Sequence, residues 1–447
     1  MSKLGNYISV QNGYAFKSKD FIKNLSGMPV IKIGNVTGGS FIDLSSYDTI
    51  SEEIARKVKS FQTKDDDILI AMTGANVGKV SRIAKGTQPC LINQRVGRFI
   101  LKEDCPYSSD FIYYLVSSNK SFQYFSNTAD GAAQPNISGK LIEDLEFPDI
   151  SPKAANKAGK YLKVLDEKIQ LNTQINQTLE QIAQALFKSC FVDFDPVRAK
   201  VQALSDGLNL EQAELAAMQA ISGKTPEELT ALSQTQPDRY SELAKTAKAF
   251  PCEMVEVDGV EVPKGWEYCS FGDVSECFDS KRIPLSKQQR EKRKGNIPYY
   301  GATSVMDYVD EAIFDDIYLL VGEDGSVLKE DGTPFTQYIW GKSWVNNHAH
   351  VLKGRNGIST EHLMIFIQQT NISAYITGAV QLKLNQKNMN SIPFLKANNA
   401  INAFFAEYIE SLYAKIRKNF DENKVLEATR DLLLPKLLSG NFSNGKN

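Results

Sequence analysis

Apolar and polar positions follow two kinds of pattern along this chain. Short apolar runs bounded by Gly, Asn and Asp, such as residues 29–33, 67–70 and 98–101, are typical of β-strands. Residues 111–125 and 360–369 instead repeat apolar positions at helical spacing. The mixture of short strands and helices predicts globular parts of mixed α/β (α+β) class.

Two longer stretches, residues 151–195 and 396–440, have apolar positions that alternate in steps of three and four, as in a coiled coil. Each stripe includes two Asn at matching positions, and buried Asn residues are used to fix the register of paired helices. We therefore expect two long helices that pack antiparallel on each other. The residues predicted to pair are Leu165, Ile169, Asn172, Asn176, Leu179, Leu186, Leu412, Ile416, Asn419, Asn423, Leu426 and Leu433.

An internal repeat explains why the two helices match. The segment GAAQ at 131–134 recurs as GAVQ at 378–381, a shift of 247 residues, and the same shift relates Asn172 to Asn419. Farther upstream the match drifts, with 28–30 resembling 297–299 and 91–93 resembling 344–346. The chain is thus predicted to hold two copies of one unit related by a pseudo-two-fold axis.

The repeat sets the expected domain boundaries. We predict two globular domains, each followed by a long helix, with a helical connector that has no counterpart at the C-terminus. The boundaries are residues 1–150 for the first domain, 151–195 for its helix, 196–262 for the connector, 263–395 for the second domain and 396–440 for its helix.

The segment TGANVGKV at 73–80 resembles a phosphate-binding loop, but the chemistry is incomplete. Only three residues separate Gly74 from Gly78, and Val80 stands where a hydroxyl would hold Mg²⁺. A tight turn with glycines at positive φ is the better interpretation. Thr73, Asn76 and Lys79 are then polar side chains that a turn alone does not need.

Composition narrows the class of protein. The 447 residues have a net charge of −2 and six scattered cysteines, without an apolar run of 18 residues or a signal-peptide core. These features predict a cytoplasmic protein without membrane segments. His348 and His350 lack a nearby cysteine or carboxylate in the sequence, so we expect no metal site. We also find no nucleophile and base that would form a catalytic site.

Two regions have side chains of the kinds that contact DNA. Residues 287–294 carry clustered Lys and Arg in a predicted basic loop, preceded by Lys281 and Arg282, and clustered cations contact phosphates. The loop GAAQPNISG at 131–139 is rich in amides, which pair with adenine edges. The full set of expected DNA contacts is Thr73, Asn76, Lys79, Asn93, Arg95, Gln134, Asn136, Ser138, Lys281, Arg282, Arg293, Thr303, Asn346, Asn347 and His348.

The chain resembles the DNA-specificity (S) subunit of type I restriction-modification systems. The resemblance is carried by DILIAMTGANVGKV, GAAQPNISGKLIEDLEFP, LNTQINQTLEQIAQALFKSCFVDFDPVRAK, GNIPYYGATS and LLLPKLLSGNF, in this order over the whole chain. In the second copy, Glu323 and Asp324 take the places of Ala75 and Asn76, so contacts in that loop are expected to differ.

This resemblance implies a non-catalytic protein with two target-recognition domains, one for each half of a split site in double-stranded DNA. It also implies that the helices act as a ruler and bind two methyltransferase subunits, with two restriction (motor-nuclease) subunits joining for cleavage. S-adenosylmethionine, ATP and Mg²⁺ are then expected on the partner subunits, and no cofactor on this chain. The alternative is an assembly scaffold whose paired helices organise partner proteins without reading sequence.

Overall fold

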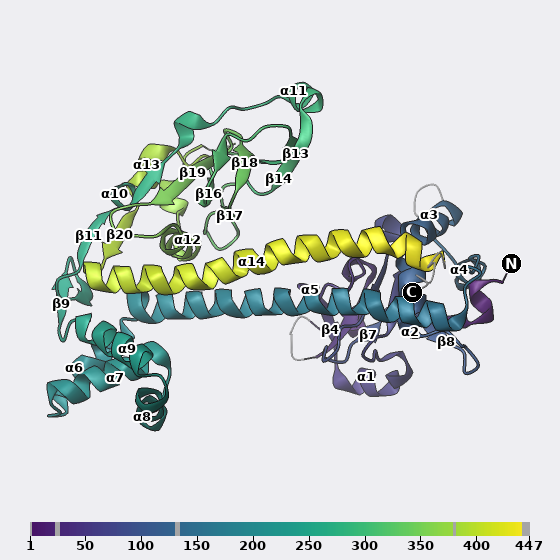
Figure 1. The fold of residues 1–447 in the computed structure, drawn as a ribbon, viewed down its shortest axis with the longest axis horizontal. Helices are drawn as coiled ribbons and strands as arrows, with labels where there is room; N and C mark the ends of the chain where they lie inside the picture. The colour runs from purple at the N-terminus through teal and green to yellow at the C-terminus, as the bar shows by residue number, and fades with distance from the viewer. Residues whose placement is uncertain (1, 23–26, 130–134, 379–380, 440–447) are drawn as a thin grey trace, which may run out of the picture. The chain divides into compact units, whose positions relative to one another are not determined.

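The structure is a computed structural model that describes residues 2–22, 27–129, 135–378 and 381–439. Its internal contacts divide the chain into two units, Met1–Asn172 with Asp421–Asn447, and Thr173–Phe420. Each unit contains one globular head and a part of each long helix (Figure 1). We call residues 2–150 head 1 and residues 263–398 head 2.

Head 1 is built from two small sheets. The first, in the order β1-β8-β5-β6, is antiparallel throughout, and the second, β2-β4-β3-β7, includes one parallel pair between β3 and β7. The strands are β1 (Ile8–Asn12), β2 (Phe21–Ile22), β3 (Met28–Ile31), β4 (Asp48–Ile50), β5 (Ile68–Ala71), β6 (Val80–Arg82), β7 (Leu91–Ile92) and β8 (Val96–Leu101). The helices are α1 (Glu52–Lys57), α2 (Ser109–Ser117), α3 (Asn119–Thr128) and α4 (Gly139–Glu143).

The single helix expected at 111–125 is in fact two. Ser118 leaves the helical conformation at φ −62°, ψ 152°, and its hydroxyl accepts a hydrogen bond from the backbone N–H of Ser121. A serine that caps an N-terminus in this way competes with continuation of the preceding helix. The chain therefore turns at Ser118 and packs α2 and α3 on each other.

Head 2 repeats this plan. Its sheets have the orders β12-β19-β16-β17 and β14-β13-β18-β15, and β11 forms a short pair with β20, the last strand before the second long helix. The strands are β11 (Glu267–Ser270), β12 (Ser275–Cys277), β13 (Lys294–Tyr300), β14 (Val305–Val309), β15 (Phe314–Asp315), β16 (Tyr318–Gly322), β17 (Thr336–Ile339), β18 (Lys342–Val345), β19 (Ala349–Gly354) and β20 (Pro393–Lys396). The helices are α10 (Phe271–Val274), α11 (Lys287–Lys292), α12 (Thr360–Gln369) and α13 (Gln386–Asn390).

Strand pairing confirms the upstream matches of the repeat. Val30 pairs with Leu91 in a parallel bridge, and Tyr299 pairs with Trp344 in the same way, as the similarity of these segments predicts. The two heads therefore share the order β4-β3-β7 and β14-β13-β18 in these sheets, whereas the fourth strand, β2 in head 1 and β15 in head 2, lies at opposite edges.

The backbone also corrects one part of the alignment. Met72 N–H donates to the Arg95 carbonyl at 2.9 Å, and Glu323 N–H donates to the His348 carbonyl at 2.8 Å. Glu323 and Asp324 thus correspond to Met72 and Thr73, and the prediction that they replace Ala75 and Asn76 is wrong. The intervening loops differ in length, so a fixed shift misplaces this position.

The long helices are α5 (Pro152–Phe187) and α14 (Asn399–Leu438). Within each unit they run side by side and antiparallel (Figure 1). In the first unit, Asn172 Nδ2 donates to Asn423 Oδ1 at 2.9 Å, and in the second, Asn419 Nδ2 donates to Asn176 Oδ1 at 2.8 Å. The predicted Asn pairs are confirmed, and all twelve predicted pairing residues are buried or half-buried.

The first helix ends earlier than the predicted residue 195. A π-helical turn follows at Lys188–Val192, and Phe194 adopts φ +56° before the connector starts. The connector is a small helical bundle, and a capping box between Thr225 and Glu228 starts one of its helices. It contains α6 (Asp195–Ser205), α7 (Leu210–Ser222), α8 (Pro226–Thr235) and α9 (Pro237–Ala249), followed by the hairpin β9 (Met254–Val257) and β10 (Val260–Pro263). None of the helices in the described residues is long and apolar enough to span a membrane.

Candidate nucleic-acid interface

The glycine turn after β5 is a short 3-10 turn, Gly74–Asn76, that joins β5 to β6. Gly74 and Gly78 have φ of +74° and +83°, which confirms the expected turn with glycines at positive φ. Asn76 Nδ2 donates to the Ile33 carbonyl, and Lys79 Nζ donates to Asn76 Oδ1, both at 3.0 Å. Asn76 thus holds the turn against the neighbouring segment, whereas the partner of Lys79 among the described residues is an uncharged amide.

A polar depression of about 490 Å³ lies beside this turn. It is formed where β1 ends, where β5 and β7 end, and where α4 begins. Arg95 is exposed at its rim and has no acidic partner among the residues that the structure describes. The polar side chains that line the depression are Asn12, Thr73, Gln94, Arg95, Asn136 and Ser138.

Backbone contacts make this depression a defined site. Thr73 and Asn136 form an isolated antiparallel bridge, and the N–H of Ile137 donates to the Met72 carbonyl at 2.9 Å. These bonds connect the loop before α4 to the end of β5. Asn136 and Ser138, from the described end of the amide-rich loop, therefore line the same depression as Met72 and Thr73 at the end of β5.

Four of the predicted contact residues gather here, namely Thr73, Arg95, Asn136 and Ser138. The prediction for the Thr73 side chain needs correction, because its hydroxyl oxygen is buried and has no hydrogen-bond partner among the described residues. Ser138 also has a structural task, since its hydroxyl accepts from the N–H of Leu141 and caps α4.

The other residues of head 1 that were predicted to contact DNA do not line the depression or lie outside the described residues. Asn93 does not line the depression, and its backbone N–H donates to the Ile31 carbonyl at 3.0 Å. Gln134 lies outside the described residues. Gln94, which stands between Asn93 and Arg95 in the same polar stretch, lines the depression as well. Asn12 also lines it but was not predicted, because it carries no local signal.

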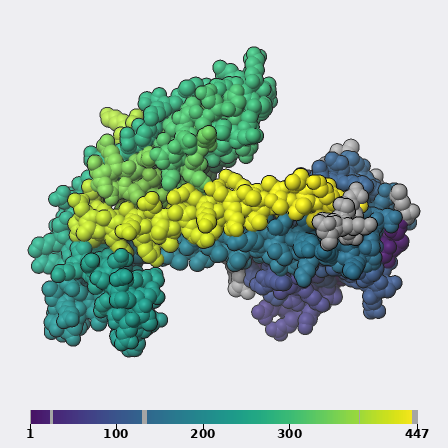
Figure 2. All heavy atoms as spheres, in the orientation of Figure 1, coloured from purple at the N-terminus to yellow at the C-terminus, as the bar shows by residue number. Residues whose placement is uncertain are grey.

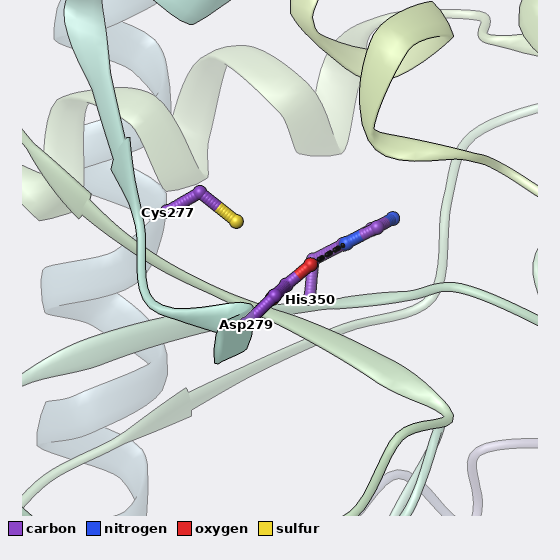
Figure 3. Close-up of side chains that lie close together, drawn as sticks. All are labelled: Cys277, Asp279 and His350. Atoms are coloured by element: carbon purple, nitrogen blue, oxygen red, sulfur yellow. Dashed lines mark hydrogen bonds and ion pairs between the residues drawn. The ribbon is translucent and has the colours of Figure 1, made fainter. Parts of the chain in front are cut away.

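The equivalent place in head 2 is filled by an ion-pair network. Arg282 bonds to Glu323 at 2.7 Å and to Asp279 at 3.2 Å, and Lys383 bonds to Glu323 at 3.2 Å. His350 Nδ1 lies 2.5 Å from Asp279 Oδ2 (Figure 3). Two carboxylates already neutralise the largely buried Arg282 guanidinium, which does not favour its predicted phosphate contact, and that contact stays a prediction.

The same cluster includes Cys277, whose sulfur lies within 4.8 Å of ligand atoms of Asp279 and His350. Figure 3 shows the Cys277 side chain apart from the bonded Asp279–His350 pair. His350 Nε2 lies 2.7 Å from the Leu384 carbonyl, so both ring nitrogens face acceptors. Burial raises the pKa of the Cys277 thiol to about 12, which disfavours the thiolate that a metal needs. These contacts describe a closed network of ion pairs.

Asp279 remains ionised in this network. Burial alone would raise its pKa, but the hydrogen bond and charge of His350, together with the Val351 N–H and Arg282, lower it below the usual value. The statement that no carboxylate accompanies the two histidines is therefore corrected. Asp279 bonds to His350, and Asp324 bonds to His348.

The predicted basic loop at 287–294 is instead helix α11 followed by the start of β13. Three of its cations are paired with acids that follow in the chain: Arg290 and Lys294 with Asp307, and Arg293 with Asp310 at 3.0 Å and with Glu311. The hydrogen bond from Lys294 is the largest of the effects that lower the pKa of Asp307 to about 2. The expectation of a free basic surface is therefore wrong for Arg293.

The remaining residues of head 2 that were predicted to contact DNA differ in how far they are buried. Asn346 is buried, and its side-chain oxygen accepts from the N–H of His348 at 2.8 Å, which gives it a turn-forming role, and its predicted DNA contact stays a prediction. Asn347 and Thr303 are exposed, and His348 is half-buried. Lys281 is exposed with Nζ 5.0 Å from the centre of the Phe278 ring.

Each head is attached to the helices by a buried polar cluster. In the first unit, Asp166 of α5 accepts from Arg82 at 3.0 Å, from the Tyr114 hydroxyl at 2.6 Å and from Arg430 of α14 at 2.9 Å. Burial, more than any other effect, raises the pKa of Tyr114. Strand β6, helix α2 and both long helices therefore meet at one carboxylate.

The second unit has a smaller cluster at the equivalent place. The Tyr338 hydroxyl donates to Glu361 at 2.6 Å, and Arg417 of α14 lies 3.5 Å from the same carboxylate. Tyr338 pairs across its strands with Leu319 as Arg82 pairs with Ile68.

Comparisons with known proteins agree with this architecture. The family described as "Type I restriction modification DNA specificity domain" matches residues 1–181 and 263–424, one match for each copy of the repeat. The "Type I restriction enzyme HindI specificity subunit" of Haemophilus influenzae is 42% identical over 362 residues, which are 74% of this chain and 77% of that protein.

Two further relatives cover nearly the whole chain. The "Type I restriction enzyme MjaIX specificity subunit" of Methanocaldococcus jannaschii is 22% identical over 92% of this chain and 86% of its own. The crystal structure of a type I restriction-modification S subunit from M. genitalium matches the fold with a TM-score of 0.53 at 16% identity, over 97% of this chain and 94% of that chain. The chain belongs to the type I restriction-modification DNA-specificity family, whose members recognise DNA sequence and are not catalytic themselves.

Proposed function

We propose that this chain reads a bipartite site in double-stranded DNA, with head 1 reading one half and head 2 the other. The observation that carries the proposal is the depression of head 1, which collects Asn12, Gln94, Arg95 and Asn136 on a duplicated head. Arginine binds guanine O6 and N7 in the major groove, and Asn and Gln bind adenine N6 and N7. A concave site lined by these groups suits base edges better than phosphates, which need mainly positive charge.

The charges of head 1 support a division of work around the depression. Arg95 is exposed without an acidic partner among the described residues, and Lys79 bonds to an uncharged amide. We assign base reading to Arg95 and the amides, and phosphate contact to Lys79. An unneutralised lysine beside a base-reading site would position the backbone and would add to the salt dependence of binding.

We further propose that the paired helices set the number of base pairs between the half-sites and dock two methyltransferase subunits, which two restriction subunits join. An exposed apolar face on α14 supports docking. Val425 and Leu432, each 65% exposed, line a shallow groove of about 340 Å³ with Ala428. Figure 2 shows uncovered side chains of α14 on the face in view. Such a stripe on a helix suits a partner helix.

Cofactors belong to the partners in this proposal. Transfer of a methyl group needs S-adenosylmethionine, and translocation with cleavage needs ATP and Mg²⁺, and we assign all three to the partner subunits. The glycine turn supports this assignment, because Asn76 and Lys79 bond to groups of the chain itself. Purified chain is expected to show no ATP hydrolysis and no binding of S-adenosylmethionine in equilibrium dialysis.

Selection from a random duplex pool by the full chain tests the reading of a bipartite site. We expect a consensus of two short blocks separated by a fixed number of unspecified base pairs. A single continuous consensus, or no consensus, would contradict the proposal. The runner-up, a scaffold that organises partners without reading sequence, is favoured by the apolar face of α14 and predicts that no sequence is enriched.

A further inference from the structure

We propose that His348, held by Asp324, is the residue with which head 2 distinguishes one base pair of its half-site. This inference rests on the proposed function, because it assumes that head 2 reads a half-site of its own. It assigns a specificity-determining side chain to the head whose equivalent depression is otherwise filled by ion pairs.

The backbone places His348 where head 1 has Arg95. The carbonyl of Arg95 accepts from Met72, and the carbonyl of His348 accepts from Glu323, at 2.9 and 2.8 Å. The next residue on each inner strand also matches, because Thr73 bridges to Asn136 and Asp324 bridges to Lys383. His348 therefore projects from the same point of the same loop as the arginine at the rim of the head 1 depression.

Asp324 fixes the ring of His348. Its carboxylate contacts Nδ1, and since a carboxylate only accepts hydrogen bonds, Nδ1 carries the proton. The side chain of His348 is 45% exposed, whereas that of His350, two residues further, is 1% exposed with both nitrogens engaged. The ring of His348 is thus oriented by the protein at Nδ1 and has its second nitrogen, Nε2, for an outside partner.

The surrounding charges favour a base over a phosphate as that partner. The neighbouring ions are engaged with one another, Glu323 with Arg282 and Lys383, and Asp279 with Arg282 and His350. Asp324 places a negative charge directly behind the imidazole, which opposes the approach of a phosphate. A neutral imidazole would accept at Nε2 from an exocyclic amino group of adenine or cytosine, and a protonated one would donate to guanine O6 or N7.

The test uses the chemically conservative change His348→Asn in the full chain. In His348→Asn, the amide nitrogen still donates to Asp324 near the place of Nδ1, but nothing reaches the place of Nε2. Arg95→Ala is the control in head 1. Each protein selects from the same random duplex pool, and binding is then measured for duplexes that carry each single base-pair change in the wild-type consensus.

We expect His348→Asn to lose discrimination at one base pair of one half-site by about fivefold or more, with the other half unchanged. Asp324→Asn should weaken discrimination at that same base pair, because the ring loses its charged anchor. An unchanged profile for His348→Asn, or equal weakening on all duplexes, would overturn the inference. Absence of a two-part consensus for the wild type would instead contradict the proposed function.

Discussion

The two heads hold different side chains on the same backbone frame. At the end of the inner strand, head 1 has Met72 and Thr73 beside an exposed Arg95, and head 2 has Glu323 and Asp324 beside His348. The hydrogen bonds that join the loops are repeated in both heads, with lengths that differ by 0.1 Å between the Met72 and Glu323 bonds. A duplicated scaffold can therefore fix where a contact residue projects while its chemistry changes freely.

The two heads also differ in whether the polar groups at this place are free to bind DNA. Head 1 offers neutral amides and one cation without an acidic partner in the described part of the chain, so its depression can exchange water for base edges. In head 2, Arg282, His350 and Lys383 are matched by Asp279 and Glu323. Removing water from such a network costs more free energy than new contacts with DNA would provide, because its groups already bond to one another. We therefore expect head 2 to read DNA from its rim.

The largest expected effect concerns the attachment of the heads. Asp166→Ala should lower the free energy of unfolding by about 3–5 kcal/mol, because Arg82 would be left buried without its closest carboxylate. Glu361→Ala in the second unit should have a smaller effect, since it bonds to a neutral hydroxyl and lies 3.5 Å from Arg417. Urea denaturation of both variants measures the difference, and equal losses would show that the two clusters are equivalent.

The next effect depends on pH. His362 is buried among Phe187, Phe191 and Phe405, and burial lowers its pKa to about 3. The unfolded chain binds this proton below pH of about 6.5, whereas the folded chain does not until about pH 3. Neutral His362 therefore costs no stability above pH 6.5. As the pH falls below 6.5, the free energy of unfolding decreases by about 1.4 kcal/mol for each pH unit.

Head 1 has a phenylalanine, Phe111, at the position that corresponds to His362 in head 2. Phe111 follows the cap Ser108 of α2 as His362 follows the cap Ser359 of α12. His362→Phe should remove about 2 kcal/mol of the loss of stability between pH 7 and pH 5. Thermal or urea unfolding across this range measures the slope for wild type and variant. Identical slopes would mean that His362 takes up a proton in the folded protein well above pH 3.

The smallest effect distinguishes free from paired cations. Lys79→Ala should reduce the slope of log affinity against log salt concentration by about one, because a phosphate contact is lost. Arg293→Ala should leave the slope nearly unchanged, since Asp310 and Glu311 already pair with Arg293. Titrations of one duplex at several salt concentrations give both slopes. A larger change for Arg293 than for Lys79 would reverse this assignment.

Much of the fold could be predicted because its signals are local or repeated. Asn172, Asn176, Asn419 and Asn423 stand at matching steps of two helical stripes, so their pairing followed from spacing alone. The strand matches between Val30 and Tyr299 followed from similar segments. In such cases the information lies within a few residues or within one repeat length.

The side-chain partners could not be predicted, because strands far apart in sequence bring them together. Asp279 and His350 are 71 residues apart, and Arg293 meets Asp310 only after a hairpin folds back. Thr73 was expected at the surface, but the bridge to Asn136 buries its hydroxyl. The sequence shows which charged and polar groups are present, whereas the fold decides which of them already have partners.

The most direct test of the account is the base preference of Arg95→Ala beside that of the wild type, on duplexes that carry both half-sites with every single base-pair change. We predict a loss of about 1–3 kcal/mol of discrimination at one base pair of one half-site, with the other half read as before. Relaxed reading of both halves, or uniform weakening on all duplexes, would contradict the claim that each head reads its own half through this surface.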